Sequence, residues 1–414
     1  MAARAPAAGP PVDLEPWRPR AWLLLFILAG VLGILLGGAS ALFVPRGEFA
    51  EHRYHLWRWQ AETVVPALAR IAGIRPEPAA AANEDAVRQY FALTSRLRAE
   101  LAKEQPDTRL VEALENERAT YENDVERFIT QALTEVIGSA GLQRPLPLFR
   151  DIELTWPPVA FELTSPPRLL VRSPRARIER LSDTLLQPGL TLADIERIEA
   201  RADTPDTVSI VVSLGGLAAY PAIVRDDRSY AAILETAAHE WVHHYLAFYP
   251  LGQQWGKGGD AEVLNETVAS IAGRELARLV MLRYPIDLPP GEDGSGPPSN
   301  RNPEIDFNAE MRALRLAVDD LLAQGRIAEA EQLMEAKRRY LADNGIPIRK
   351  INQAYFAFYG TYADNPQSSN PIGPLFETLW QRTNDIGEFL RIARGITSRA
   401  QLEAVVAALE PTAP

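Results

Sequence analysis

The sequence predicts an α+β protein, mainly helical, that follows one transmembrane helix near the N-terminus. Three observations carry this prediction. Apolar residues recur at helical spacing along most of the chain, whereas runs of β-branched residues broken by prolines gather within residues 145–228. The third is a stretch without charge from Trp22 to Val44. At about 1.5 Å per residue, that stretch is long enough to cross a hydrocarbon core of about 30 Å.

Residues 1–21 are rich in Ala and Pro and lack periodicity, so we expect a disordered cytoplasmic tail. Residues 22–44 are interpreted as a retained membrane anchor. A cleaved secretory signal is the alternative, because Arg18 and Arg20 precede the apolar stretch and Ala39-Ser40-Ala41 resembles a cleavage site. Arginines flank the stretch on both sides and leave the orientation open. A single N-terminal anchor before a long domain favours a single-pass cell-membrane protein with its domain outside the cytoplasm.

The next region, residues 45–140, is predicted to hold a juxtamembrane segment and a helical hairpin. Apolar residues keep helical spacing from Val87 to Leu101 and from Leu110 to Ala132, and Pro106 separates the two runs. The hairpin therefore consists of two antiparallel helices.

Residues 141–284 are predicted to form the core of the protein. A small β layer with a short helix near residues 192–202 comes first, and helices at 229–249 and 260–284 follow. Residues 285–302 are rich in Pro, Gly and acidic side chains and read as a flexible loop. Residues 303–414 form a C-terminal helical region that begins with a hairpin, 303–324 and 326–344.

Composition removes several classes of function. A net charge of -11 and a pI near 5.2 argue against a nucleic-acid partner, which requires a basic surface. The chain has no cysteine, so thiolate metal sites, cysteine nucleophiles and disulfides are excluded. The oligomeric state cannot be read from the sequence.

The helix at residues 229–249 carries the pattern His239-Glu240-x-x-His243. Residues four apart share a helical face, so both imidazoles can bind one Zn²⁺ while Glu240 reaches a metal-bound water. Such a short pattern also occurs by chance. However, three of the five histidines of the chain lie within residues 239–244, on an otherwise apolar helix where unpaired polar rings are costly. A metal ion would explain the cluster.

A catalytic zinc site needs a third protein ligand. Asn265-Glu266-x-x-Ala269 begins 22 residues after His243, and the two motifs together resemble the gluzincin metallopeptidases. The resemblance covers residues 205–280 and implies a zincin-like domain in which Glu266 is the third ligand, with Glu262 as the alternative. Many gluzincins have an acidic residue where this chain has Ser270, so the partner of a ligand histidine must differ here.

More loosely, the run from Gly256 to Asp260 and residues 352–373 resemble a bacterial group of aminopeptidases. The gluzincin resemblance, together with the anchor expected at residues 22–44, implies a membrane-anchored, zinc-dependent peptidase acting on peptide or protein substrates. His239, His243 and Glu266 would hold the zinc, which lowers the pKa of its bound water, and Glu240 would take the proton of that water. Whether it attacks peptides internally or from an end is open.

Other parts of the chain offer supporting candidates. In gluzincin-like folds an edge strand pairs with substrate backbone, and 208–213 or 219–224 are candidates, although each is also an ordinary core strand. Asn352, Tyr355, Tyr359 and Tyr362 share one helical face, and the Tyr359 phenol is a candidate donor to the developing oxyanion. Core packing is the other interpretation. Arg349 is a candidate for holding a substrate carboxylate.

A second function is consistent with the same sequence. The chain would then be a non-enzymatic, membrane-anchored envelope scaffold or binding protein. In that case the histidines are structural or hold a structural metal, and the helical hairpins bind a partner.

Overall fold

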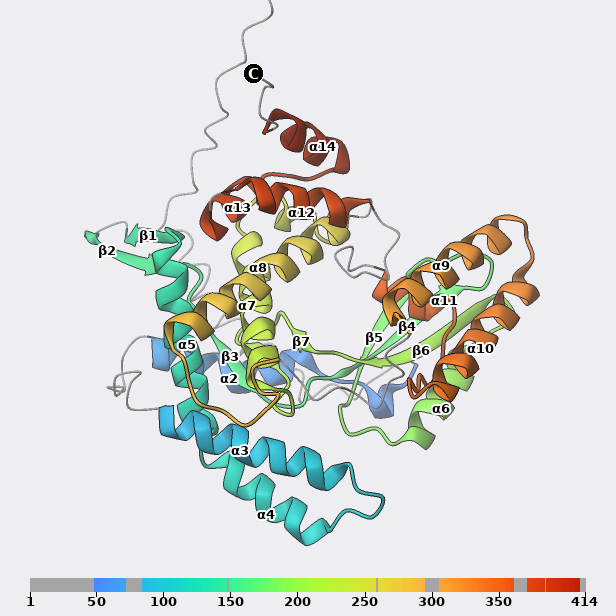
Figure 1. Cartoon of the computed structure of the whole chain (residues 1–414), viewed down its shortest axis with the longest axis horizontal. Helices are drawn as coiled ribbons and strands as arrows, with labels where there is room; N and C mark the ends of the chain where they lie inside the picture. Colours follow the sequence, from blue (N-terminus) through green and yellow to red (C-terminus); the bar gives the residue numbers. More distant parts are fainter. Residues whose placement is uncertain are drawn as a thin grey trace, which may run out of the picture.

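The computed structural model describes residues 48–71, 84–146, 149–257, 260–294, 305–360, 371–383 and 385–409. The tail and membrane span expected at residues 1–44 lie outside these ranges. Among the helices that are described, none has the length and apolar character needed to cross a bilayer. The described chain is α+β and mainly helical, with small sheets, and it forms two lobes (Figure 1).

The larger lobe, which we name the histidine lobe, lies on the left of Figure 1. It is mainly helical and shares one hydrophobic cluster that extends from Val87 to Val406. Its elements are α3 (Glu84–Leu101), α4 (Thr108–Ala119), α5 (Glu122–Ser139), β1 (Gln143–Leu146), β2 (Phe149–Thr155), β3 (Phe161–Leu163), β7 (Gly216–Leu217), β8 (Ala222–Val224), α7 (Tyr230–Leu246), η3 (Gly252–Gln254), α8 (Ala261–Arg283), α12 (Ile372–Arg382), α13 (Ile386–Ala393) and α14 (Arg399–Ala408).

The second lobe, named the sheet lobe, lies on the right of Figure 1. Its central strand β4 pairs antiparallel with β5 on one side and β6 on the other. Helices α9, α10 and α11 pack with one face of this sheet, and α6 covers the other. The elements are η1 (Ala50–His52), β4 (Arg168–Pro174), β5 (Ser182–Leu186), α6 (Leu192–Ala202), β6 (Thr207–Ser213), α9 (Phe307–Ala323), α10 (Ile327–Asp343) and α11 (Gln353–Tyr359). Helix α2 (Leu56–Ile71) follows η1 along the chain.

The lobes do not follow the expected division into a core at 141–284 and a helical region at 303–414. Strands β4 to β6 pack with α9 to α11, whereas α12 to α14 return to the histidine lobe. The single helix expected from Leu110 to Ala132 is also two helices, α4 and α5, with a break at Thr120 and Tyr121. Helical spacing alone could not reveal this break, because apolar residues keep a helical period on both sides of it. Leu114 of α4 packs with Leu93 and Leu97 in a small cluster, whereas α5 joins the main cluster of the lobe.

The expected β layer is divided into separate small sheets among the described residues. In the histidine lobe, β8 lies between β3, to which it is parallel, and β7, to which it is antiparallel. The expectation that residues 219–224 form an edge is therefore wrong, because β8 has hydrogen-bonded neighbours on both sides. The short strand β7 is an outer strand of this sheet.

Helices α7 and α8 have the most extensive contact of the described elements. A small residue permits their close approach. A Cβ added to Gly273 on α8 would lie 3.0 Å from the Glu235 carbonyl oxygen and 3.0 Å from the backbone nitrogen and Cβ of His239 on α7. The two backbones therefore meet beside the first histidine of the motif.

The start of α7 is fixed by a residue from the segment expected to be a flexible loop. Within residues 285–294, which are the described part of that segment, Glu292 is fully buried. Its carboxylate accepts hydrogen bonds from the backbone N–H of Tyr230 at 3.0 Å and from Arg98, and its carbonyl accepts from Ala231 at 2.9 Å. A negative charge at a helix N-terminus is favourable, so this part of the segment anchors α7.

We expect Gly273→Val to lower the free energy of unfolding by about 1–3 kcal/mol, because the added carbons must separate α7 from α8. Chemical denaturation followed by circular dichroism measures the change. Ala317→Val on the exposed side of α9 is the control and should cost only a few tenths of a kcal/mol. Equal losses in the two variants would contradict the close approach at Gly273.

Candidate metal centre

The two helices bring together the three ligands expected from the sequence. His239 and His243 project from one face of α7, and Glu266 faces them from α8. The two Nε2 atoms are 3.0 Å apart, and Glu266 Oε2 lies 3.3 Å from His239 Nε2 and 3.6 Å from His243 Nε2. The side chains keep 11–16% of their surface exposed, so they are mostly but not completely buried.

These distances fit a tetrahedral zinc site. Ligand atoms about 2.1 Å from zinc at tetrahedral angles are about 3.4 Å from one another, close to the three observed separations. Glu266 Oε2 is also buried without a hydrogen-bond partner. A buried carboxylate oxygen without a partner carries a large desolvation cost, which a cation at the centre of the group would offset.

A neighbouring amide orients one of the histidines. Asn265, which is 2% exposed, accepts a hydrogen bond from Nδ1 of His243 on its Oδ1 at 2.7 Å. This bond places the proton on Nδ1 and leaves Nε2 free as a ligand atom. Asn265 thus orients the ligand histidine in place of the acidic residue that many gluzincins have where this chain has Ser270. In the sequence, the Asn-Glu pair at 265–266 was the signal for this role.

Without a metal, the pair of His243 and Glu266 holds a proton. Burial disfavours the charged form of His243, but the negative charge of Glu266 outweighs it and raises the pKa of His243 to about 9. Burial opposes ionisation of Glu266 as well, yet the two imidazoles hold its pKa well below the usual range. The metal-free state is therefore an ion pair of imidazolium and carboxylate.

Glu240 lies on the same helix, next to both histidines. It is buried, and burial raises the pKa of its carboxyl, to which the charge of Glu266 adds. Its Oε1 faces the backbone of β7, because a Cβ added to Gly216 would lie only 2.4 Å from that oxygen. Glycine at 216 thus lets the outer strand of the sheet approach the carboxylate.

His244, the third histidine of the cluster, has a different place. Its Nε2 is 2.7 Å from the carbonyl oxygen of Ala219, in the connection between β7 and β8. Burial lowers the pKa of His244 to about 4, so the ring is neutral and donates this hydrogen bond from Nε2. His244 holds the connection of the outer strand rather than a metal.

The remaining candidates lie apart from this group. Glu262 is on the first turn of α8 and does not join the three ligands. Tyr359, at the end of α11 in the sheet lobe, packs against Tyr355 and Phe358. Tyr362 lies outside the described residues.

Arg349 is already engaged within the sheet lobe. Its Nη1 donates to the buried carboxylate of Glu199 at 2.9 Å, and its Nη2 donates to the carbonyl of Val211 at 3.3 Å. The expectation that Arg349 holds a substrate carboxylate is therefore wrong, because its charge compensates that of Glu199.

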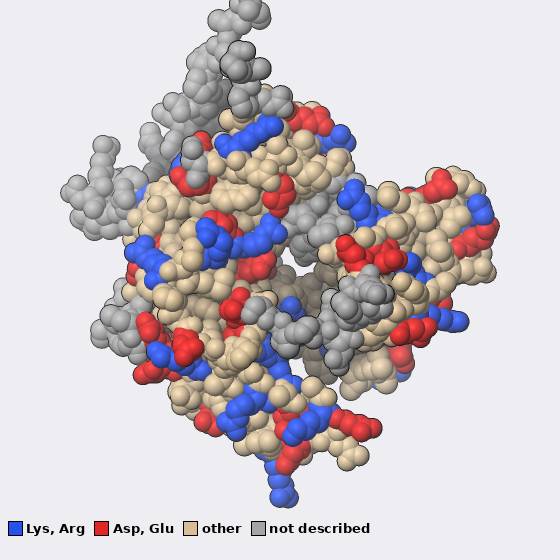
Figure 2. All heavy atoms as spheres, viewed as in Figure 1, with Lys and Arg blue, Asp and Glu red and all other residues tan. Residues whose placement is uncertain are grey.

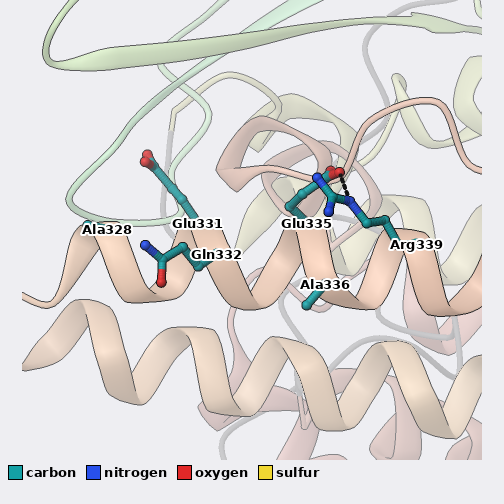
Figure 3. A pocket seen from close by; sticks show the side chains of 6 residues that line it. All are labelled: Ala328, Glu331, Gln332, Glu335, Ala336 and Arg339. Carbon is teal, nitrogen blue, oxygen red and sulfur yellow. Dashed lines mark hydrogen bonds and ion pairs between the residues drawn. The ribbon is translucent and has the colours of Figure 1, made fainter.

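A surface hollow of about 490 Å³ lies on α10, in the sheet lobe (Figure 3). Its charged groups are already paired, since Glu331 binds Arg175 and Glu335 binds Arg338 and Arg339. These paired side chains are therefore a weaker candidate for a functional site than the group of His239, His243 and Glu266 on α7 and α8. The hollow is lined by Ala328, Glu331, Gln332, Glu335, Ala336 and Arg339.

We expect zinc affinity to rise about tenfold per pH unit between pH 7 and 9. Zinc requires neutral imidazole, and His243 keeps its proton up to a pKa of about 9 in the metal-free state. Binding therefore releases one proton over this range. Competition with a chelator of known proton affinity measures the slope, and an affinity independent of pH would contradict the ion pair.

We expect Asn265→Ala to weaken zinc binding by about 10–100-fold, because His243 loses the acceptor that orients its ring. Asn265→Asp restores an acceptor and should lose less affinity. Chelator competition at constant pH measures both variants, with thermal unfolding as the control for folding. Equal affinity in Asn265→Ala and the unaltered chain would exclude the orienting role.

Comparison of the chain with models of known protein families, with curated protein sequences and with solved structures finds no match.

Proposed function

We propose that the chain is a zinc-dependent peptidase. The observation that carries this proposal is the convergence of two imidazoles and one carboxylate at distances of 3.0, 3.3 and 3.6 Å. Three protein ligands are typical of catalytic zinc, whereas structural zinc usually takes four. Zinc bound here would supply a Lewis acid and an activated water. The resemblance to gluzincins rests on the two motifs that contain these ligands, His239-Glu240-x-x-His243 and Asn265-Glu266-x-x-Ala269.

Glu240 is the proposed general base. It lies one residue after His239 and three before His243 on α7, and in this role its carboxylate would meet a water held at the site. A base is most effective when its pKa approaches the working pH, and burial moves the pKa of Glu240 in that direction. In this role one carboxylate oxygen of Glu240 accepts a proton from the attacking water and later returns it to the leaving amine.

Strand β7 is the proposed docking edge for substrate backbone. It lies on the outside of its sheet, and its Gly216 borders Glu240. Backbone groups on a free strand edge can pair with an extended peptide, which would place a peptide bond beside the base. On the face seen in Figure 2, the surface is hollowed between the lobes, and Figure 1 shows α7 and β7 along one side of this hollow.

The remaining parts of the expectation stay predictions. A membrane anchor at residues 22–44 is still expected, but these residues lie outside the described ranges. The extracytoplasmic location depends on that anchor. If Tyr359 is the oxyanion donor, α11 must face the metal centre across the hollow between the two lobes. A scaffold without enzymatic activity is the alternative function, and metal content separates the two.

We expect Glu240→Gln to retain one zinc per chain and to lose at least about 10³-fold in kcat, because the amide cannot accept the proton of the water. Cleavage of a peptide library by the full chain, with zinc measured by elemental analysis, tests this expectation. Glu262→Gln is the matched control, because Glu262 is also a carboxylate on α8 but does not belong to the group of three ligands. This variant should keep full activity. Persistent turnover in Glu240→Gln would remove the base from the proposal.

Zinc content tests the proposal independently of turnover. His243→Ala should lose the zinc, because two of the three ligands cannot hold it alone. A chain that folds and melts normally without any zinc, in a zinc-containing buffer, would favour the scaffold.

A further inference from the structure

A half-exposed tryptophan borders the candidate metal centre. Trp255 directly follows η3 and is 47% exposed. Its ring meets that of His243 edge-on, with the ring centres 5.8 Å apart and the planes at 72°. A large apolar side chain is thus held in solvent beside a metal ligand.

The position of Trp255 relative to α7 is fixed by Leu251, which directly precedes η3, and by Gly252, the first residue of η3. Leu251 is fully buried, and its N–H donates to the carbonyl of Arg394 at 3.0 Å. Gly252 lies so close to the end of α7 that an added Cβ would be 2.2 Å from the carbonyl oxygen of Leu246. The chain turns away only at Gly256, where φ is +74°. The contacts of Leu251 and Gly252 therefore hold the backbone beside Trp255 in place.

An extended peptide advances about 3.4 Å per residue. A peptide bond positioned at the three ligands therefore has its neighbouring side chains within about one residue of His243, and the ring centre of Trp255 is 5.8 Å from that of His243. When an apolar side chain of the substrate covers the part of the indole that faces water, the buried apolar surface stabilises the complex.

We propose that Trp255 forms the apolar wall of a subsite, and that this subsite selects peptides with a large apolar side chain, aromatic or branched aliphatic, next to the scissile bond. This inference rests on the proposed peptidase function. It adds a substrate class that the three ligands and Glu240 do not determine.

Two other roles for Trp255 make different predictions. As a shield for the hydrogen bond between His243 and Asn265, it would affect zinc binding and all substrates equally. As a cation–π partner it would favour Arg or Lys side chains over Phe. The experiment separates these roles through the identity of the varied residue.

The test uses the full chain and peptides of Gly, Ser and Ala in which one position is Phe, Leu, Ala, Arg or Asp. Mass spectrometry identifies the cleaved bond. We expect kcat/KM for Phe and Leu next to that bond to exceed the value for Ala about tenfold. Trp255→Ala should reduce this ratio to about twofold or less, through a loss of kcat/KM for the Phe and Leu peptides. Trp255→Phe should retain the preference, and Trp57→Ala, an exposed tryptophan on α2, is the control.

Binding provides a second readout that does not depend on turnover. In Glu240→Gln, the Phe peptide should bind about tenfold more tightly than the Ala peptide by calorimetry. The added Trp255→Ala change should remove the difference.

The outcomes are separable. Cleavage with an unchanged Phe-to-Ala ratio in Trp255→Ala overturns the subsite and leaves the peptidase standing. Loss of zinc together with a uniform loss of activity assigns Trp255 to the shield, and a preference for Arg that vanishes with the indole assigns it to cation binding. If the zinc-loaded chain cleaves none of the peptides, the proposed function itself fails.

Discussion

The close packing of α7 against α8 is the constraint on which the candidate site depends. Gly273 lets the two backbones meet at His239, and this contact brings the carboxylate of Glu266 to both imidazoles. A buried carboxylate requires a compensating charge. The imidazolium of His243 supplies that charge in the metal-free state, and a divalent cation would supply it in the loaded state. The same geometry therefore compensates the buried carboxylate in the metal-free chain and would also accept a divalent cation.

The rest of the histidine lobe holds this pair of helices in place. Glu292 fixes the start of α7, and η3 packs close to its end through Gly252. Between these ends, His244 holds the connection of β7 to β8, and Gly216 lets β7 reach Glu240. Each contact joins α7 to a different segment of the chain, so the helix is positioned by several distant parts of the sequence.

The surroundings of the ligands give the site its chemical character. Asn265 orients His243 through a neutral amide, which adds no charge to a site that already buries two carboxylates, Glu240 and Glu266. Burial raises the pKa of Glu240, whereas the imidazoles lower that of Glu266. Two carboxylates within one site are thus suited to different tasks, one to accept a proton and the other to remain charged and hold a cation.

The sequence by itself determined the features that depend on neighbouring residues. Helical periodicity placed α6, α7, α8, α9 and α10 close to their observed bounds, and spacing by four residues put His239 and His243 on one face, because helix geometry is local. Tertiary structure alone decided which strand is an edge, why Arg349 is engaged by Glu199, how the lobes interleave, and where Trp255 stands. These depend on contacts between segments far apart in the chain, whose pairing is set by the burial of shared apolar surface and by the compensation of buried charge.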